Sequence, residues 1–250
     1  MYHGLHQDRR APGVHDSYYS VSPEAFARQL DWLHEHGYRT RRLTDPTSSP
    51  RDVVVTFDDG DASMMTVALP LLLGRGMVAE FCITSDYVGQ AGRVTRRDVR
   101  ELADNGMGIL SHGRTHRPLR ALSDGDLSEE LRRSKRDLET WCGRPVTGLS
   151  VPGGRAGRRE YRAARAEGYD VLLNSTPGPN RRPGRYLHRL CITQRTDLTD
   201  FAGLVQWRGV APRRLALRTA ALEVPKRVLG DVRYANLRAV AVSRRTEEPC

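Results

Sequence analysis

The chain has 250 residues, of which 38% are hydrophobic, with a mean hydropathy of −0.56 and a formal net charge of +10. This length suits one large domain, or one domain with an extension, and every apolar run is far shorter than the ~20 residues that a membrane-spanning helix needs. The positive charge favours polyanionic neighbours, but aromatic residues make up only 6% and no nucleic-acid-binding motif is present, so specific nucleic-acid recognition is not expected.

Short apolar strands and amphipathic helices alternate along the N-terminal half. Ser22 and Pro23 begin a helix whose apolar residues recur on one face until Gly37 ends it. A capping box of Thr95 and Asp98 opens a later helix. In order, this half is predicted to contain a helix from 23 to 37, a strand at 53–57, a helix-like stretch at 62–73, a strand at 79–84 and a helix from 96 to 106.

The same alternation continues in the second half. The predicted elements are a strand at 107–110, a helix at 127–141, a strand at 146–151, a helix at 161–167 and a strand at 169–173. At least five strand and helix units in this order indicate a parallel α/β fold of the barrel type. Reactive residues of such folds collect at the carboxyl ends of the strands.

Two adjacent carboxylates end the strand at 53–57. Asp58 and Asp59 repel one another and resist burial, so their position is typical of a site that uses a metal ion or proton chemistry. His112 and His116 follow the strand at 107–110 and lie four positions apart. Asp59 and the two histidines make three ligands, which leaves a position open for water as in catalytic zinc sites.

Thr-Phe-Asp-Asp-Gly at 56–60, followed by His-x-x-x-His at 112–116, resembles the motif pair of the polysaccharide deacetylase family, the NodB-homology or carbohydrate esterase family 4 enzymes. The resemblance covers roughly residues 1–204. It implies a distorted, incomplete (β/α) barrel of about seven β/α units, whose first core strand lies at Met1 to His3. We therefore predict a NodB-like domain at 1–205 and a basic C-terminal extension, helical, at 206–250.

The resemblance also implies the metal site. Asp59, His112 and His116 would bind a divalent cation, most simply Zn²⁺, with Co²⁺ or Mn²⁺ as alternatives. Asp58 would stay off the metal and act as the general base. Metal-activated water would then attack an acetamide carbonyl and release acetate and a free amine.

The general acid and the substrate contacts are placed by weaker motifs. His188, in Tyr-Leu-His-Arg-Leu at 186–190, is the best match to the histidine that protonates the leaving amine in the family, and His3 is a second candidate. The resemblance further suggests that Ser150, Pro152, Gly153 and His3 contact the substrate.

One family motif departs from its usual form. Where the family has Arg-x-Pro-x-Gly, this chain has Ser150 in place of the arginine, and the arginine's usual aspartate partner would fall near Asn174. Both members of that ion pair are absent together, as expected because a single buried charge is destabilising. Since the pair normally tunes the catalytic base, we expect altered tuning of Asp58 rather than a dead enzyme.

The leading hypothesis is a metal-dependent hydrolase that removes N-acetyl groups from amino sugars of a polysaccharide, oligosaccharide or glycoconjugate. Two alternatives stay open. One is a non-catalytic or weakly active carbohydrate-binding scaffold at a membrane, and the other is a deacetylase or amidohydrolase of a small metabolite.

The remaining expectations concern location and thiols. The first residues lack the basic start and apolar stretch of a secretory signal, so a cytoplasmic location is expected, although a start site assigned too late would hide an export signal. The arginines after Gln206 suggest peripheral association with an anionic membrane, set against a solvated helix packed on the barrel. Four cysteines without metal-binding spacing read as free thiols, at 82, 142, 191 and 250.

Overall fold

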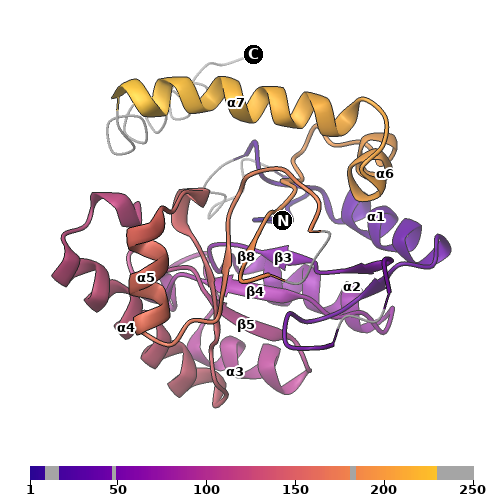
Figure 1. Cartoon of the computed structure of the whole chain (residues 1–250). Helices are drawn as coiled ribbons and strands as arrows, with labels where there is room; N and C mark the ends of the chain where they lie inside the picture. Colours follow the sequence, from indigo (N-terminus) through magenta and orange to yellow (C-terminus); the bar gives the residue numbers. More distant parts are fainter. Residues whose placement is uncertain (9–16, 47–48, 181–183, 230–250) are drawn as a thin grey trace, which may run out of the picture.

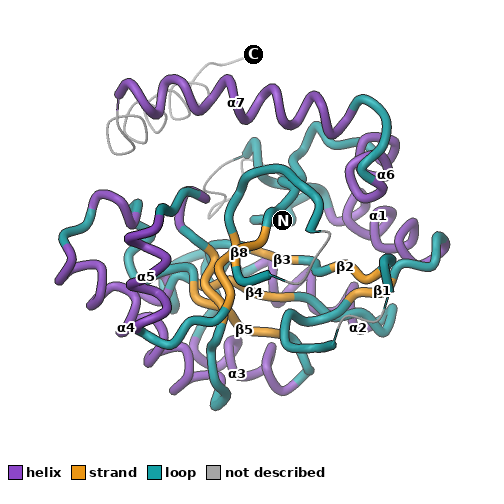
Figure 2. The backbone as a smooth tube through the Cα atoms, viewed as in Figure 1, coloured by secondary structure: helices purple, strands orange, loops and turns teal. Residues whose placement is uncertain are grey.

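The computed structural model describes residues 1–8, 17–46, 49–180 and 184–229, with side chains up to 221. Within these ranges a parallel sheet in the order β3-β4-β5-β6-β7-β8 curls into a half-barrel, with helices packed around it (Figure 1, Figure 2). The predicted α/β fold of the distorted-barrel type is thereby confirmed. Its strands are β3 (Thr56–Phe57), β4 (Glu80–Ile83), β5 (Gly108–Ser111), β6 (Gly148–Ser150), β7 (Val171–Leu173) and β8 (Tyr186–Leu187).

The helices that the sequence predicts are present with bounds close to those expected, whereas α6 was not predicted. Thr95 and Asp98 form the predicted capping box of α3, and Ser22 caps α1. Their apolar faces pack on the sheet and form the main core with Phe57 and Phe81. The helices are α1 (Pro23–Glu35), α2 (Leu69–Leu73), α3 (Arg96–Asp104), α4 (Asp124–Cys142), α5 (Arg158–Ala166), α6 (Leu198–Gln206) and α7 (Ala211–Leu229).

Two predicted elements are divided. The strand predicted at 53–57 consists of β2 (Asp52–Val53), which pairs with β1 (Arg39–Thr40), and of β3 in the main sheet. The helix predicted at 62–73 begins as a π-helix, Met64–Ala68, before α2. There the amide of Leu69 donates to the carbonyl of Met64, five residues back, and Pro70, which has no amide hydrogen, follows directly.

The N-terminal segment lies between the two ends of the curled sheet. Tyr2 forms a parallel bridge with Phe57 of β3, and the amide of Ile192, beyond β8, donates to the carbonyl of Met1 at 3.0 Å. These contacts bring the chain after β8 close to the carboxyl end of β3, on the opposite edge of the sheet order.

A buried carboxyl group in β4 gives a stability prediction. Glu80 is 2% exposed, its Oε1 accepts a hydrogen bond from the amide of Leu43 at 2.6 Å, and burial raises its pKa from 4.5 to about 7. A Cβ atom at Gly108 would lie 1.9 Å from Glu80 Oε2, so only glycine leaves room for this carboxyl group.

Because the folded pKa of Glu80 lies above the unfolded value, the folded state loses stability as the pH rises from about 4.5 through 7. Glu80→Gln should therefore raise the free energy of unfolding by about 2 kcal/mol at pH 8, and change it little at pH 5, where Glu80 is protonated. Urea unfolding at both pH values measures the difference. An equal effect at pH 5 and pH 8 would show that Glu80 does not titrate in this range.

The C-terminal helix α7 follows α6 and extends across one side of the molecule (Figure 1). The guanidinium of Arg218 lies 4.3 Å from the centre of the Tyr18 ring. In the part of the chain that the structure describes, no helix is long and apolar enough to cross a membrane. Residues 230–250 of the predicted extension, including Cys250, lie outside the described residues. Cys82, Cys142 and Cys191 are free thiols, as predicted.

Candidate active site

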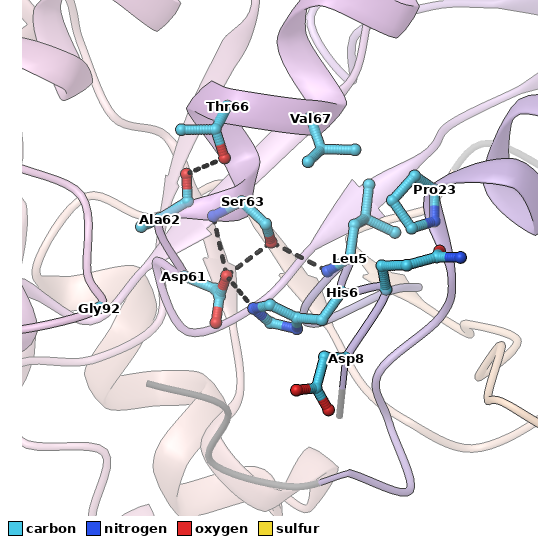
Figure 3. Close-up of a pocket in the computed structure, with 11 residues that line it drawn as sticks. Leu5, His6, Asp8, Pro23, Asp61, Ala62, Ser63, Thr66, Val67 and Gly92 are labelled. Atoms are coloured by element: carbon cyan, nitrogen blue, oxygen red, sulfur yellow. Dashed lines mark hydrogen bonds and ion pairs between the residues drawn. The ribbon is translucent and has the colours of Figure 1, made fainter. Parts of the chain in front are cut away.

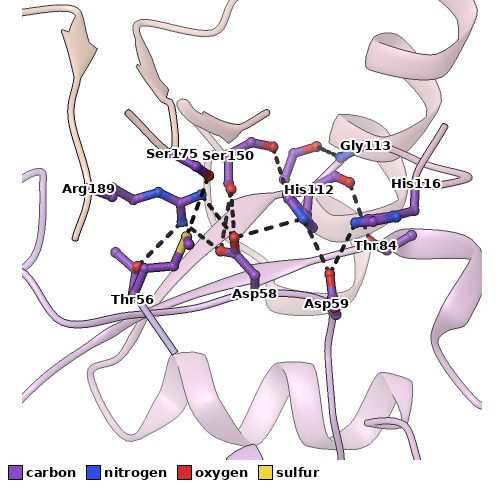
Figure 4. A network of polar contacts seen from close by, with 12 residues as sticks. Thr56, Asp58, Asp59, Thr84, His112, Gly113, His116, Ser150, Ser175 and Arg189 are labelled. Atoms are coloured by element: carbon purple, nitrogen blue, oxygen red, sulfur yellow. Dashed lines mark hydrogen bonds and ion pairs between the residues drawn. The ribbon is translucent and has the colours of Figure 1, made fainter. Parts of the chain in front are cut away.

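The carboxyl ends of β3 and β5 bring the predicted metal ligands together. Asp59 Oδ1 lies 3.3 Å from Nε2 of His112 and 3.2 Å from Nε2 of His116 (Figure 4). Asp59 and His116 both have positive φ, 79° and 62°, a conformation that is uncommon outside glycine and concentrates at functional sites. The turn at Asp59 continues into Gly60, whose φ is 86°.

The three side chains fit a divalent cation. One ligand atom from each lies within 4.8 Å of the others, and Asp59 Oδ1 is buried without a well-formed hydrogen bond to any described residue. His112 Nδ1 lies 2.8 Å from the carbonyl oxygen of Ser150. Because a carbonyl can only accept, Nδ1 carries a proton, so in the neutral imidazole Nε2 has the lone pair and faces Asp59.

Electrostatics couple this cluster to a second carboxylate. Burial alone would lower the pKa of His112, but the carboxylates of Asp58 and Asp59 raise it above its ordinary value. Burial alone would raise the pKa of Asp59, yet the adjacent imidazoles of His112 and His116 hold it well below the ordinary range. Asp59 therefore stays ionised, and its carboxylate supplies a negative charge that a bound cation would neutralise.

Asp58 is held by an arginine that the motif analysis did not find. Arg189 Nη1 and Nη2 donate to the two carboxylate oxygens of Asp58, at 2.7 and 2.9 Å (Figure 4). Both residues are buried, with 2% exposure for Asp58 and 6% for Arg189. Burial alone would raise the pKa of Asp58, but the guanidinium lowers it well below the ordinary range. The arginine and aspartate of the usual ion pair are absent, as expected, but Arg189 from another segment supplies a guanidinium to Asp58.

Ser150 and Asn174, the two departures from the family motif, surround this pair. Ser150 Oγ lies 3.3 Å from both carboxylate oxygens of Asp58, and the carbonyl of Asn174 accepts from Arg189 Nε at 3.0 Å. The guanidinium thus comes from the segment after β8 instead of from the end of β6. Its signal in the sequence is the presence of a charged residue next to His188, between Leu187 and the apolar run 190–192.

The two candidate acids lie in different surroundings. His3 follows Tyr2 as Asp58 follows Phe57, so the bridge places His3 next to Asp58 in the register. Its Nδ1 is buried without a hydrogen bond to any described residue, and burial lowers its pKa against the opposing effect of Asp59 and Asp58. His188 instead places Nδ1 3.3 Å from Asn174 Oδ1.

Pro152 and Gly153, predicted to contact substrate, form a short turn after β6. A Cβ atom at Gly113 would lie 3.2 Å from Pro152, so this turn packs against the loop between the two histidines. Gly153 has a φ of 67°, and a Cβ atom there would meet nothing within 4 Å. The backbone at Gly153 therefore faces open space.

A pocket of about 370 Å³ lies next to the loop that carries the candidate ligand Asp59 (Figure 3). Asp61 Oδ1 accepts from Ser63 Oγ and lies 3.2 Å from His6 Nε2, while Ser63 Oγ accepts from the amide of Leu5. These contacts tie the turn after Asp59 to the N-terminal segment, so Asp61 supports the turn and takes no part in the ligand cluster. The lining residues are 5–8, 23, 61–63, 66, 67 and 92.

The chain is similar in sequence and in fold to known polysaccharide deacetylases. The family model for polysaccharide deacetylase matches residues 45–172. The predicted polysaccharide deacetylase YxkH of Bacillus subtilis (strain 168) is 29% identical over 196 residues, which are 74% of this chain and 70% of YxkH. The crystal structure of BC0361, a polysaccharide deacetylase from Bacillus cereus, has 25% identity and a TM-score of 0.73, covering 82% of this chain and 67% of that one.

A more distant structure has the same fold. The de-N-acetylase from Aggregatibacter actinomycetemcomitans aligns with a TM-score of 0.72 over 81% of this chain and 97% of that one, at 20% identity. At that identity the likeness concerns the fold alone.

Proposed function

The chain belongs to the polysaccharide deacetylase family, and we propose that it is a metal-dependent hydrolase that removes N-acetyl groups from amino sugars of a glycan or glycoconjugate. One observation carries this proposal. The ligand cluster of Asp59, His112 and His116 lies beside a second, oriented carboxylate, Asp58, which makes no part of the cluster. Metal ligands together with a separate base are the groups that amide hydrolysis by activated water requires.

Cation binding and proton transfer are assigned to different residues in this proposal. Asp59, His112 and His116 would hold the cation, most simply Zn²⁺ because two imidazoles and one carboxylate suit that ion. When bound, Zn²⁺ lowers the pKa of a water from about 16 toward 7. Asp58, fixed through both oxygens by Arg189, would accept the proton as that water attacks the acetamide carbonyl.

A histidine would then donate a proton to the leaving amine. His3 and His188 are the two candidates, and the position of His3 next to Asp58 in the register favours His3. Nδ1 of His188 contacts Oδ1 of Asn174, and this contact instead favours a role for His188 in holding the segment that carries Arg189.

Acetate release from a panel of N-acetylated sugars and glycans by Zn²⁺-loaded protein tests the proposal. We expect release that a chelator abolishes and Zn²⁺ restores, and none from the His112→Ala/His116→Ala variant. If the protein binds one Zn²⁺ but releases no acetate from any substrate, the hydrolase proposal fails and a binding scaffold is favoured.

The same assay separates the two histidines. His3→Ala should lower kcat by about 10²-fold or more if His3 is the acid, with Zn²⁺ affinity unchanged. His188→Ala should then retain most of its activity. The reverse result would assign the proton donor to His188.

A further inference from the structure

Two side chains of α4 face the loop between the metal-ligand histidines. Glu130 Oε1 accepts hydrogen bonds from the amides of Arg114 and Thr115, at 2.8 and 2.7 Å. The hydroxyl of Thr115 also donates to the same carboxylate, 3.1 and 3.0 Å from its two oxygens. One turn further along α4, Ser134 Oγ donates to the carbonyl of Gly113 at 2.9 Å.

These contacts pair backbone donors and acceptors of the loop that have no partner in regular secondary structure. The loop leaves β5 at Ser111 and passes through Gly113 with a φ of 74° and His116 with a φ of 62°, so it continues neither as a strand nor as a helix. Its amides at 114 and 115 both point to one carboxylate, which is 5% exposed. Without that acceptor, two backbone donors would be left unpaired in a partly buried position, at a cost for each.

The carboxylate also packs tightly at the first turn of the loop. A Cβ atom at Gly113 would lie 3.0 Å from Glu130 Oε1, so glycine is the residue that lets the loop approach the helix. Ser134 in turn lies 2.8 Å from Ser111 Oγ, which accepts from the amide of Gly113 at 3.0 Å. The backbone between His112 and His116 is therefore fixed from α4, at its beginning and at its middle.

We propose that Glu130 is a positioning residue for the metal centre: it holds the loop so that His116 faces Asp59 and His112 before a cation binds. The proposal rests on the proposed metal-dependent function. Its physical basis is preorganisation, because a loop already in the binding geometry does not have to be ordered when the metal arrives. Glu130 itself is not a ligand in this arrangement, since its oxygens are used by the loop.

Zn²⁺ affinity, measured by competition with a chromogenic chelator, tests the proposal without any substrate. Glu130→Ala should bind Zn²⁺ about 10- to 100-fold more weakly than the wild type, as is typical when a partner that orients a ligand is removed. Glu130→Gln keeps an oxygen that accepts from both amides, so it should restore most of the affinity. The absorption spectrum of the Co²⁺ form should change in Glu130→Ala and return in Glu130→Gln.

Glu160 provides a matched control. It is 4% exposed and its Oε2 accepts from a loop amide, that of Gly157, at the start of α5 and away from the three ligands. Glu160→Ala should lower the melting temperature but leave the Zn²⁺ affinity unchanged. If Glu130→Ala lowers the melting temperature to a similar extent and also leaves the affinity unchanged, Glu130 is only structural and the proposal is overturned.

Two further outcomes keep the test decisive. Should Glu130→Ala fail to fold, Thr115→Val removes the hydroxyl that donates to Glu130 and accepts from the amide of Arg117 at 3.4 Å, and it is expected to weaken Zn²⁺ binding to a smaller extent. Glu130→Asp shortens the side chain, so that it no longer reaches both loop amides, and should also weaken binding. An unchanged affinity in both Thr115→Val and Glu130→Asp would overturn the proposal. A wild-type protein that binds no divalent cation would instead refute the proposed metal-dependent function itself.

Discussion

Asp58→Asn should lower the rate of acetate release by about 10²- to 10⁴-fold, the usual contribution of a positioned general base, while leaving Zn²⁺ affinity almost unchanged. Asparagine keeps the shape of the side chain and one oxygen toward Arg189, but it cannot take a proton from water. Because Asp58 lies outside the ligand cluster of Asp59, His112 and His116, the metal should still bind. Steady-state acetate release, with Zn²⁺ binding measured on the same sample, checks both expectations.

Asp59→Asn is the control for this experiment. The two aspartates are adjacent, but only Asp59 lies within 3.3 Å of both histidine nitrogens. Asp59→Asn should therefore lose Zn²⁺ affinity together with activity, whereas Asp58→Asn should lose activity alone. Undiminished turnover by Asp58→Asn would exclude Asp58 as the base.

Arg189→Met should destabilise the fold by about 3–5 kcal/mol near neutral pH, because it leaves the buried carboxylate of Asp58 without its partner. The arginine lowers the pKa of Asp58 in the folded state. The stability from this pair is therefore fully present above the ordinary pKa of an aspartate, near 4, and is lost as the pH falls below it. The difference between wild type and variant should shrink on acidification. Urea unfolding of metal-free protein from pH 7 down to about pH 2 measures it.

Arg75 offers a control that also makes two hydrogen bonds to one carboxylate, through a different pair of nitrogens and in a more exposed environment. It also binds a carboxylate through two nitrogens, with Nε and Nη2 at 2.7 and 3.1 Å from the oxygens of Asp31, whose side chain is 50% exposed. Arg75→Met should cost no more than about 1 kcal/mol, as exposed ion pairs do. Equal losses in the two variants would mean that burial does not decide the strength of the Asp58 and Arg189 pair.

The position of the candidate metal ligands could be predicted from the sequence because it depends on local rules. Asp59 and His112 each follow a short apolar run, and the carboxyl ends of parallel strands share one edge of a sheet. The capping box at Thr95 and the turn at Gly37 are likewise local, and the helices before and after them lie where predicted.

Arg189 could not be placed in the same way, since its contact with Asp58 joins residues 131 positions apart. The contact depends on how far the sheet curls, which the pattern of apolar residues does not specify. The strand predicted at 53–57 fails for a related reason: its halves pair with different partners, β1 and β4, and a continuous apolar run carries no mark of that division. The short β8 lacks the length that makes a strand recognisable.

The bond between Asp58 and Arg189 has a consequence for how the protein is made. On the ribosome, the segment with Asp58 emerges long before residue 189, and at ~5–20 residues per second the two are separated by many seconds of synthesis. Through that interval the base has no guanidinium to orient it. Under the proposed function, activity therefore appears only once nearly the whole barrel has been translated, and a nascent or truncated chain that ends before residue 189 should be inactive even with Asp59, His112 and His116 all present.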